Sequence, residues 1–163
     1  MALSSGQKAA LKAFIEADAG LNANPNTNVG NSIIAAVLNV AASPEFVVWR
    51  TSVGRDEITQ ADAWAWIEVD NLTVGKARIW EWLFEGVGSI NASKANVRAG
   101  IAECWSGTAA KLAVQAAVLG VCKRPALLIE KIFSTGTGST GSPAIMGREG
   151  TITTDEIEEA RAS

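Results

Sequence analysis

The chain has 163 residues, of which 48% are hydrophobic and 19% charged, and its formal net charge is −3. This is the composition of a globular chain that can bury a core, and it excludes a disordered or collagen-like protein. The sequence contains no histidine, which excludes a Ser-His-Asp triad, a Cys-His pair and an imidazole metal site. No apolar run reaches the roughly 18–20 residues that a membrane span needs, so one globular domain outside the membrane is the starting expectation.

Helical periodicity begins near the N-terminus. Ser4 and Gln7 have the spacing of a capping box, and the apolar residues Leu11 and Ile15 then lie on one helical face. Gly20 is expected to end this helix before an Asn-rich loop. Apolar spacing, caps and breakers together predict six helices, at residues 5–18, 31–42, 73–85, 93–105, 109–124 and 126–133.

The second predicted helix is followed by a region that the pattern does not assign. The apolar face of this helix consists of Ile33, Ile34, Val37, Leu38 and Ala41. Residues 46–51 have strand chemistry but follow a Ser-Pro pair typical of a helix start, so a short helix and an extended segment both stay open. Trp64 and Trp66 alternate with smaller residues, which fits a short strand or a packed loop equally well.

Residues 93–133 are expected to form the helical core of the molecule. Four residues share one helical face: Val97, Ile101, Cys104 and Trp105. Thr108 is a candidate N-cap for the next helix, and Pro125 should kink or end that helix because proline lacks a backbone N–H. We therefore expect Trp105 to be buried.

The C-terminal residues differ from the rest. Residues 134–142 contain only Ser, Thr and Gly, which is the composition of a flexible linker. Residues 143–153 are extended in character. Thr153 and Glu156 have capping-box spacing at the start of a short acidic helix, 155–162.

This C-terminal arm must dock on the chain's own core, on a neighbouring copy or on another protein, and we expect it to be mobile in the free monomer and ordered in an assembly. Burying its three large apolar groups would contribute roughly 5–9 kcal/mol, whereas fixing ten backbone residues costs about 10–20 kcal/mol. The predicted docking residues are Ile145, Met146, Arg148 and Ile152. The expected fold is mainly α, with a helical body at 1–133 and a linker and arm at 134–163 that add a short strand and a terminal helix. Deleting residues 136–163 should leave that body folded.

Charge is unevenly distributed along the chain. Residues 94–131 carry six Lys/Arg and two Asp/Glu, whereas the segments on both sides carry an excess of acid. A basic segment of this kind is a candidate nucleic-acid surface. It fits equally a contact with the acidic segment of a neighbouring subunit, or an ordinary solvated face. Its candidate surface residues are Lys111, Lys123, Arg124 and Lys131.

The sequence context of the tryptophans, cysteines, glycines and C-terminal acids favours structural roles for them. Four of the six tryptophans lie among acidic residues that would repel a phosphate backbone, so core and interface anchors are favoured over stacking platforms for nucleic acid. Cys104 and Cys122 have no CxxC spacing and are expected to be buried thiols. The Gly-rich run 135–141 lacks the lysine that closes a phosphate loop. The acids of 155–159 could hold a divalent cation but fit the first turn of a helix.

No catalytic residue, cofactor or metal is therefore expected, and a carboxylate-dependent enzyme is the third class of function considered.

Several short stretches carry a resemblance: Asn26-Thr27-Asn28, Ser43-Pro44-Glu45-Phe46, Val48-Trp49-Arg50-Thr51, residues 72–78, residues 90–100, residues 133–138, Ser142-Pro143-Ala144 and Glu149-Gly150. Together they resemble small virion proteins encoded among the structural genes of tailed bacteriophages.

The resemblance implies a head–tail connector, or adaptor, which is a small helical bundle arranged as a ring under the portal. The implied partners are further copies of the chain in a ring, with twelvefold symmetry as one candidate, the portal protein, and a tail or nozzle protein. DNA would pass through the channel without sequence-specific binding. The implied location is the head–tail junction of the virion, after synthesis in the host cytoplasm. The alternative is a DNA-binding or packaging protein, similar to a small terminase subunit, that uses residues 94–131.

Overall fold

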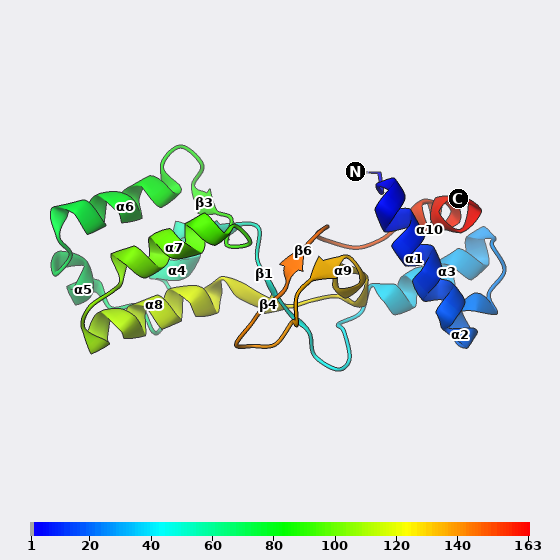
Figure 1. The fold of residues 1–163 in the computed structure, drawn as a ribbon, viewed down its shortest axis with the longest axis horizontal. Coiled ribbons are helices and arrows are strands. Elements are labelled where there is room, and N and C mark those ends of the chain that lie inside the picture. Colours follow the sequence, from blue (N-terminus) through cyan, green and yellow to red (C-terminus); the bar gives the residue numbers. More distant parts are fainter. Residues whose placement is uncertain (1) are drawn as a thin grey trace. The chain divides into compact units, whose positions relative to one another are not determined.

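The computed structural model describes residues 2–163 and shows a mainly α protein, as the sequence predicts (Figure 1). Ten helices lie in the described residues: α1 Ser5–Ala17, α2 Ala19–Asn22, α3 Asn28–Leu38, α4 Arg55–Thr59, α5 Trp66–Asp70, α6 Val74–Phe84, α7 Ala95–Cys104, α8 Ala109–Val121, α9 Leu128–Ile132 and α10 Thr154–Ala162. The strands are short: β1 Val47–Trp49, β2 Val53–Gly54, β3 Ser89–Ile90, β4 Lys123–Pro125, β5 Ser134–Thr135 and β6 Ile145–Met146.

All six predicted helices are present, and the caps explain where most of them begin. Ser4 and Gln7 form the expected capping box, and Thr108 accepts from the Lys111 N–H at the start of α8. The second helix begins earlier than predicted, because Thr27 caps it by accepting from the Gly30 N–H, and it ends at Leu38 instead of residue 42. The segment from residue 46 is extended, which decides between the two alternatives left open there.

The chain forms two compact units whose boundaries differ from the predicted division at residue 133. Unit 1 contains the residues up to Val48 together with Pro125–Ser163, and unit 2 is the continuous segment Trp49–Arg124. The C-terminal arm thus belongs to the same unit as the N-terminal helices. Within residues 2–163, no helix combines the length and the apolar character required to cross a membrane.

Unit 1 is held by an aliphatic core to which α1, α2, α3, α9 and α10 contribute. α10 packs against both α1 and α3, and α9 contacts the same two helices. The fully buried leucine and isoleucine residues of this core are Leu11, Ile15, Ile34, Leu38, Ile129 and Ile157. Leu11 and Ile15 are one turn apart on α1, as are Ile34 and Leu38 on α3, so each helix presents one apolar edge to α10.

Unit 2 is held by an aromatic core. The rings of Trp80 on α6 and Trp105 after α7 lie 5.3 Å apart at 74°, and the Trp64 ring lies 5.3 Å from Trp105, also edge to face. Trp105 is fully buried, as predicted. α6 and α7 approach closely at Gly100, where a Cβ atom would lie 3.3 Å from the Leu83 side chain. Edge-to-face rings of this kind add to the free energy gained by burying them.

Candidate interaction surfaces

The structure places the predicted docking residues of the arm against their own unit. Met146 and Ile152 are buried, with 8% and 3% of their surface exposed, and Arg148 pairs with Glu156 on α10. Ile145 alone among these four is an exposed apolar side chain, at 45%. The expectation that the arm needs a partner is therefore wrong for the chain as folded here.

The arm is ordered within its own chain because its backbone finds hydrogen-bond partners there. In the structure β6 pairs antiparallel with β5, with Ser134 opposite Met146. The Asn39 side chain donates to the Ile152 carbonyl at 2.9 Å and accepts from the Ile152 N–H at 2.8 Å. The arm also buries Ile157 and Ala160 of α10, two apolar groups beyond the three counted from the sequence.

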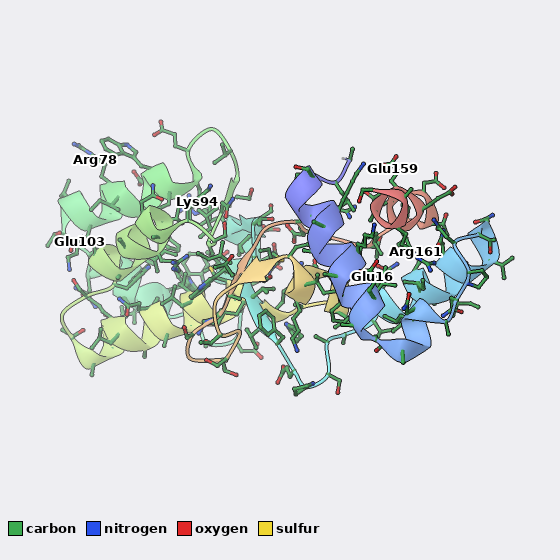
Figure 2. The ribbon with its side chains drawn as sticks, turned by 45° about the vertical axis from the view of Figure 1, so that its right-hand side comes forward. Glu16, Arg78, Lys94, Glu103, Glu159 and Arg161 are labelled. Carbon is green, nitrogen blue, oxygen red and sulfur yellow. The ribbon has the colours of Figure 1, made fainter. Side chains whose placement is uncertain are left out.

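Further polar contacts hold the arm against the rest of unit 1. The buried Glu130 carboxylate accepts from the N–H groups of Gly150 and Leu127, at 2.8 and 2.9 Å. Arg161 reaches from α10 to the Asn31 side-chain oxygen and to the Asn24 carbonyl, at 3.1 and 2.7 Å (Figure 2). These contacts join residues more than a hundred positions apart, or bridge the arm to α9, so short-range sequence patterns do not predict them.

Within the arm, Arg148 forms an ion pair with Glu156. One guanidinium nitrogen lies 2.8 and 2.9 Å from the two carboxylate oxygens. Burial raises the pKa of the Glu156 carboxyl, but the Thr153 N–H and the Arg148 guanidinium outweigh burial, so its pKa lies below the ordinary value. Glu156 also completes the predicted capping box with Thr153, which accounts for it without a metal ion.

The predicted basic residues are spread over several elements of the two units. Lys111 and Lys123 stand near opposite ends of α8, twelve residues apart, which corresponds to about 18 Å along a helix. The Lys111 ammonium donates to the Asn71 carbonyl at 2.8 Å, and the Lys123 ammonium lies over the Trp49 ring. Arg124 follows in β4, and Lys131 belongs to unit 1, where its ammonium lies over the Phe46 ring.

The most unusual surface of unit 1 lies on α3. We call it the α3 stripe: Val29, Ile33, Val37 and Val40, which are 74%, 50%, 42% and 54% exposed. The first three are spaced one turn apart, and Val40 follows just past the helix end. α3 contains no charged residue at all. The exposed fractions add up to about two whole side chains, so removing the stripe from water would contribute roughly 3–6 kcal/mol to the free energy of binding a partner.

The sequence contained a signal for this stripe. The apolar residues of α3 occur in adjacent pairs, and two adjacent residues lie about 100° apart around a helix, so a pair can divide between the core and another face. The sequence placed Ile33, Ile34, Val37 and Leu38 on one apolar face, but the structure buries only Ile34 and Leu38 and leaves Ile33 and Val37 facing outwards. The stripe is therefore a candidate contact surface.

A second apolar surface of unit 1 is a groove between α1 and α9, which we call the α1–α9 groove. It has a volume of about 470 Å³ and is lined by Ala10, Ala13, Phe14, Leu128, Lys131 and Ile132. The two alanines leave room beside the larger apolar side chains. Lys131 is the charged residue of this lining, and it is held over the Phe46 ring. An apolar side chain from a partner fits this lining better than a polar one does.

Unit 2 carries exposed apolar residues of its own. The most exposed ones are Trp66, Ile67, Val74, Trp82 and Val87. Trp82 lines a shallow hollow of about 310 Å³ together with Arg55, Glu81 and Glu85. Arg78 on α6, Lys94 just before α7 and Glu103 on α7 are the labelled side chains of this unit in Figure 2, and all three are charged. This surface is less uniformly apolar than the α3 stripe.

The described residues contain no group of three or more Cys, Asp or Glu side chains placed to hold a metal ion. Cys104 and Cys122 are free and buried, and burial raises the pKa of each thiol to about 11, so both are poor nucleophiles at neutral pH.

Comparisons with protein-family models, curated proteins and solved structures found no match to this chain. The surfaces above are therefore the features on which a function can be argued.

Proposed function

We propose that this chain is a structural subunit of a tailed phage, a head–tail connector that forms a ring between portal and tail. One observation carries the proposal: α3 has no charged residue and leaves an apolar stripe exposed on unit 1. Single exposed apolar residues are common on monomers, but a continuous row on an uncharged helix is typical of an interaction site. The resemblance of the sequence to small phage virion proteins supplies the kind of assembly.

From the sequence, the main physical support for a connector is an arm that needs a partner. Met146 and Ile152 of the arm are buried in unit 1, so the arm does not supply that support. The contacts with further copies, with the portal and with a tail or nozzle protein are assigned instead to the exposed surfaces: the α3 stripe, the α1–α9 groove and the apolar residues of unit 2. DNA would pass through the ring without sequence-specific contacts.

Mass spectrometry of purified virions tests this proposal directly. We expect the chain in virions, at a constant number of copies per portal. Virions assembled without it should retain filled or leaking heads that lack tails. Absence of the chain from intact virions would overturn the proposal.

The DNA-binding alternative makes a different prediction. A packaging protein that used residues 94–131 would bind duplex DNA with an affinity that falls steeply as salt rises. We expect weak binding with a shallow salt dependence, because Lys111, Lys123 and Lys131 each make a contact within their own unit. A steep slope, reduced by Lys123→Ala, would favour packaging over the connector.

A further inference from the structure

We propose that the hollow around Trp82 on unit 2 binds an arginine side chain of a partner protein. The hollow has a volume of about 310 Å³ and is lined by Arg55, Glu81, Trp82, Phe84 and Glu85, all of them residues of unit 2. Only the identity of the partner, a portal or tail protein, rests on the proposed function.

The centre of the site is the exposed ring of Trp82. Its neighbours on α6, Trp80 and Phe84, are buried in the aromatic core, whereas Trp82 is 64% exposed. In the described chain, no other ring and no cation packs on it. Indole is the aromatic side chain that attracts a cation most strongly to its face, so the open face of Trp82 can take a positively charged group.

Two carboxylates lie beside this ring, at a place where a helix does not favour them. Glu81 and Glu85 are four residues apart, so two like charges are one turn apart at the C-terminal end of α6. That end carries the negative pole of the helix dipole, and the last turn of α6 contains no basic residue to offset it. Local conflicts of this kind are expected at functional sites, and a bound cation would relieve both of them.

The nearby cations of the chain do not neutralise these carboxylates. Arg55 lines the hollow and Arg78 lies one turn before Trp82 on α6 (Figure 2). Within residues 2–163, neither arginine forms an ion pair with Glu81 or Glu85. Two carboxylates and one guanidinium give the lining a net charge of −1. One further cation makes it neutral, whereas an apolar group would bury the carboxylates without a partner.

An arginine side chain matches these groups better than other cations do. Its guanidinium is planar, so it stacks on an indole ring while its N–H groups donate to carboxylates at the edge of that ring. The ammonium of lysine is a more strongly hydrated point charge without a plane to stack. Calcium and magnesium ions need more oxygen ligands than two glutamates provide.

Titration with a hexa-arginine peptide, followed by NMR of the ¹⁵N-labelled indole groups, tests the site. We expect the Trp82 signal to shift and Trp82→Ala to raise the dissociation constant about three- to tenfold. The matched control is Trp66, which is also 64% exposed but does not line the hollow; its signal and the affinity of Trp66→Ala should stay unchanged. Equal responses of the two tryptophans would overturn the proposal, as would equal affinity for hexa-lysine.

Removal of the two carboxylates is the second test. Glu81→Gln combined with Glu85→Gln should weaken binding of hexa-arginine and reduce its salt dependence. The variant should melt no lower than the wild type, because it loses a like-charge pair. Asp70→Asn combined with Glu103→Gln removes the same charge from exposed positions of unit 2 outside the hollow, and should bind as the wild type does. Equal weakening by both pairs would show a general attraction between opposite charges and overturn the site.

Analysis of virions keeps this site separate from the proposed function. If the chain is a virion protein but Trp82→Ala binds hexa-arginine as the wild type does, the site is wrong and the function stands. If the peptide binds at Trp82 as expected but virions lack the chain, the function is wrong and the site stands.

Discussion

The two units of this protein reach stability in different ways. Unit 2 is one continuous segment around stacked and edge-to-face tryptophans, with Trp80 and Trp105 buried to 2% and 0% exposure. Unit 1 combines the two ends of the chain around leucine and isoleucine side chains, and polar contacts such as that of Arg161 hold its last helix in place. A unit made from chain ends depends on both ends being present, whereas a continuous unit does not.

This difference also gives each unit its own reporter. All six tryptophans lie within residues 49–124, so tryptophan fluorescence reports on unit 2 alone. Amide hydrogen exchange at α3 and α10 reports on unit 1. The predictions below use these two signals to test how independent the units are.

The largest effect is expected from deletion of residues 136–163. Removing α10 takes Ile157 and Ile152 out of the core of unit 1, which alone costs about 3–6 kcal/mol, and it leaves α1 and α3 without the helix that both pack against. We therefore expect unit 1 to unfold while unit 2 stays folded, in contrast to the expectation from sequence that the whole helical body survives. The measurement is hydrogen exchange at α3 together with the tryptophan emission maximum.

A matched control lies in the same arm. Ile145→Asn changes a residue that is 45% exposed, and surface changes usually shift stability within about 0.5 kcal/mol. Slow exchange at α3 in the truncated chain would show that unit 1 does not need its C-terminal part. Loss of the native tryptophan signal would show that unit 2 is not independent.

The next largest effect is expected in unit 2. Trp105→Ala removes a fully buried ring in contact with Trp64 and Trp80 and should cost about 3–5 kcal/mol of unfolding free energy. Denaturant unfolding followed by fluorescence gives the value. Trp82 is 64% exposed on the same unit, so Trp82→Ala should change the unfolding free energy of unit 2 by less than about 0.5 kcal/mol. Equal effects of the two substitutions would contradict the assigned core.

A smaller effect is expected at the polar contact that fixes α10. Arg161→Ala leaves the fully buried Asn31 without one of its donors and should destabilise unit 1 by about 1–3 kcal/mol. Hydrogen exchange at α10 should speed up while fluorescence unfolding of unit 2 is unchanged. Arg78→Ala, an exposed arginine on α6, is the control. Unchanged exchange at α10 in Arg161→Ala would mean that aliphatic packing holds this helix unaided.

The smallest effect is a dependence on pH. Because the pKa of Glu156 is lowered in the folded state, its ion pair stabilises unit 1 fully above the ordinary pKa of 4.5 and progressively less as the pH falls through the lowered value. Glu156→Gln should therefore be less stable than the wild type at pH 7, and the two should converge in acid. Exchange at α10 between pH 3 and 7 measures this. A difference in stability between the two proteins that stays constant across that pH range would show that the charge of Glu156 does not stabilise unit 1.

Unit 2 provides the comparison. The pKa of Glu57 is also lowered, by the Gly54 N–H first and then by Arg50, but its side chain is 44% exposed. Solvent screens such a pair. Glu57→Gln should consequently reduce the pH dependence of the unfolding free energy of unit 2 by less than Glu156→Gln reduces that of unit 1.

Local sequence determined much of the secondary structure. The six predicted helices and the terminal helix exist because their apolar spacing and their caps, such as Ser4 with Gln7 and Thr153 with Glu156, act over three or four residues. The short helices α2, α4 and α5 were not predicted: α5 begins at Trp66, where the alternation of tryptophans with smaller residues fitted a strand or a loop. These helices have only four or five residues each, which gives helical periodicity little room to show in the sequence.

The tertiary structure decided where these elements are buried. From the sequence, burying the apolar side chains of the arm does not offset the entropy that the arm loses when it becomes ordered. The contacts that stabilise it, Asn39 with Ile152 and Arg161 with Asn31, join positions more than a hundred residues apart. Likewise, both members of the pair Ile33 and Ile34 are equally apolar, and only the position of α10 beside α3 buries Ile34 and leaves Ile33 outside. Apolar spacing specifies a helix and its apolar residues, whereas the direction in which each one faces depends on which distant helix packs beside it.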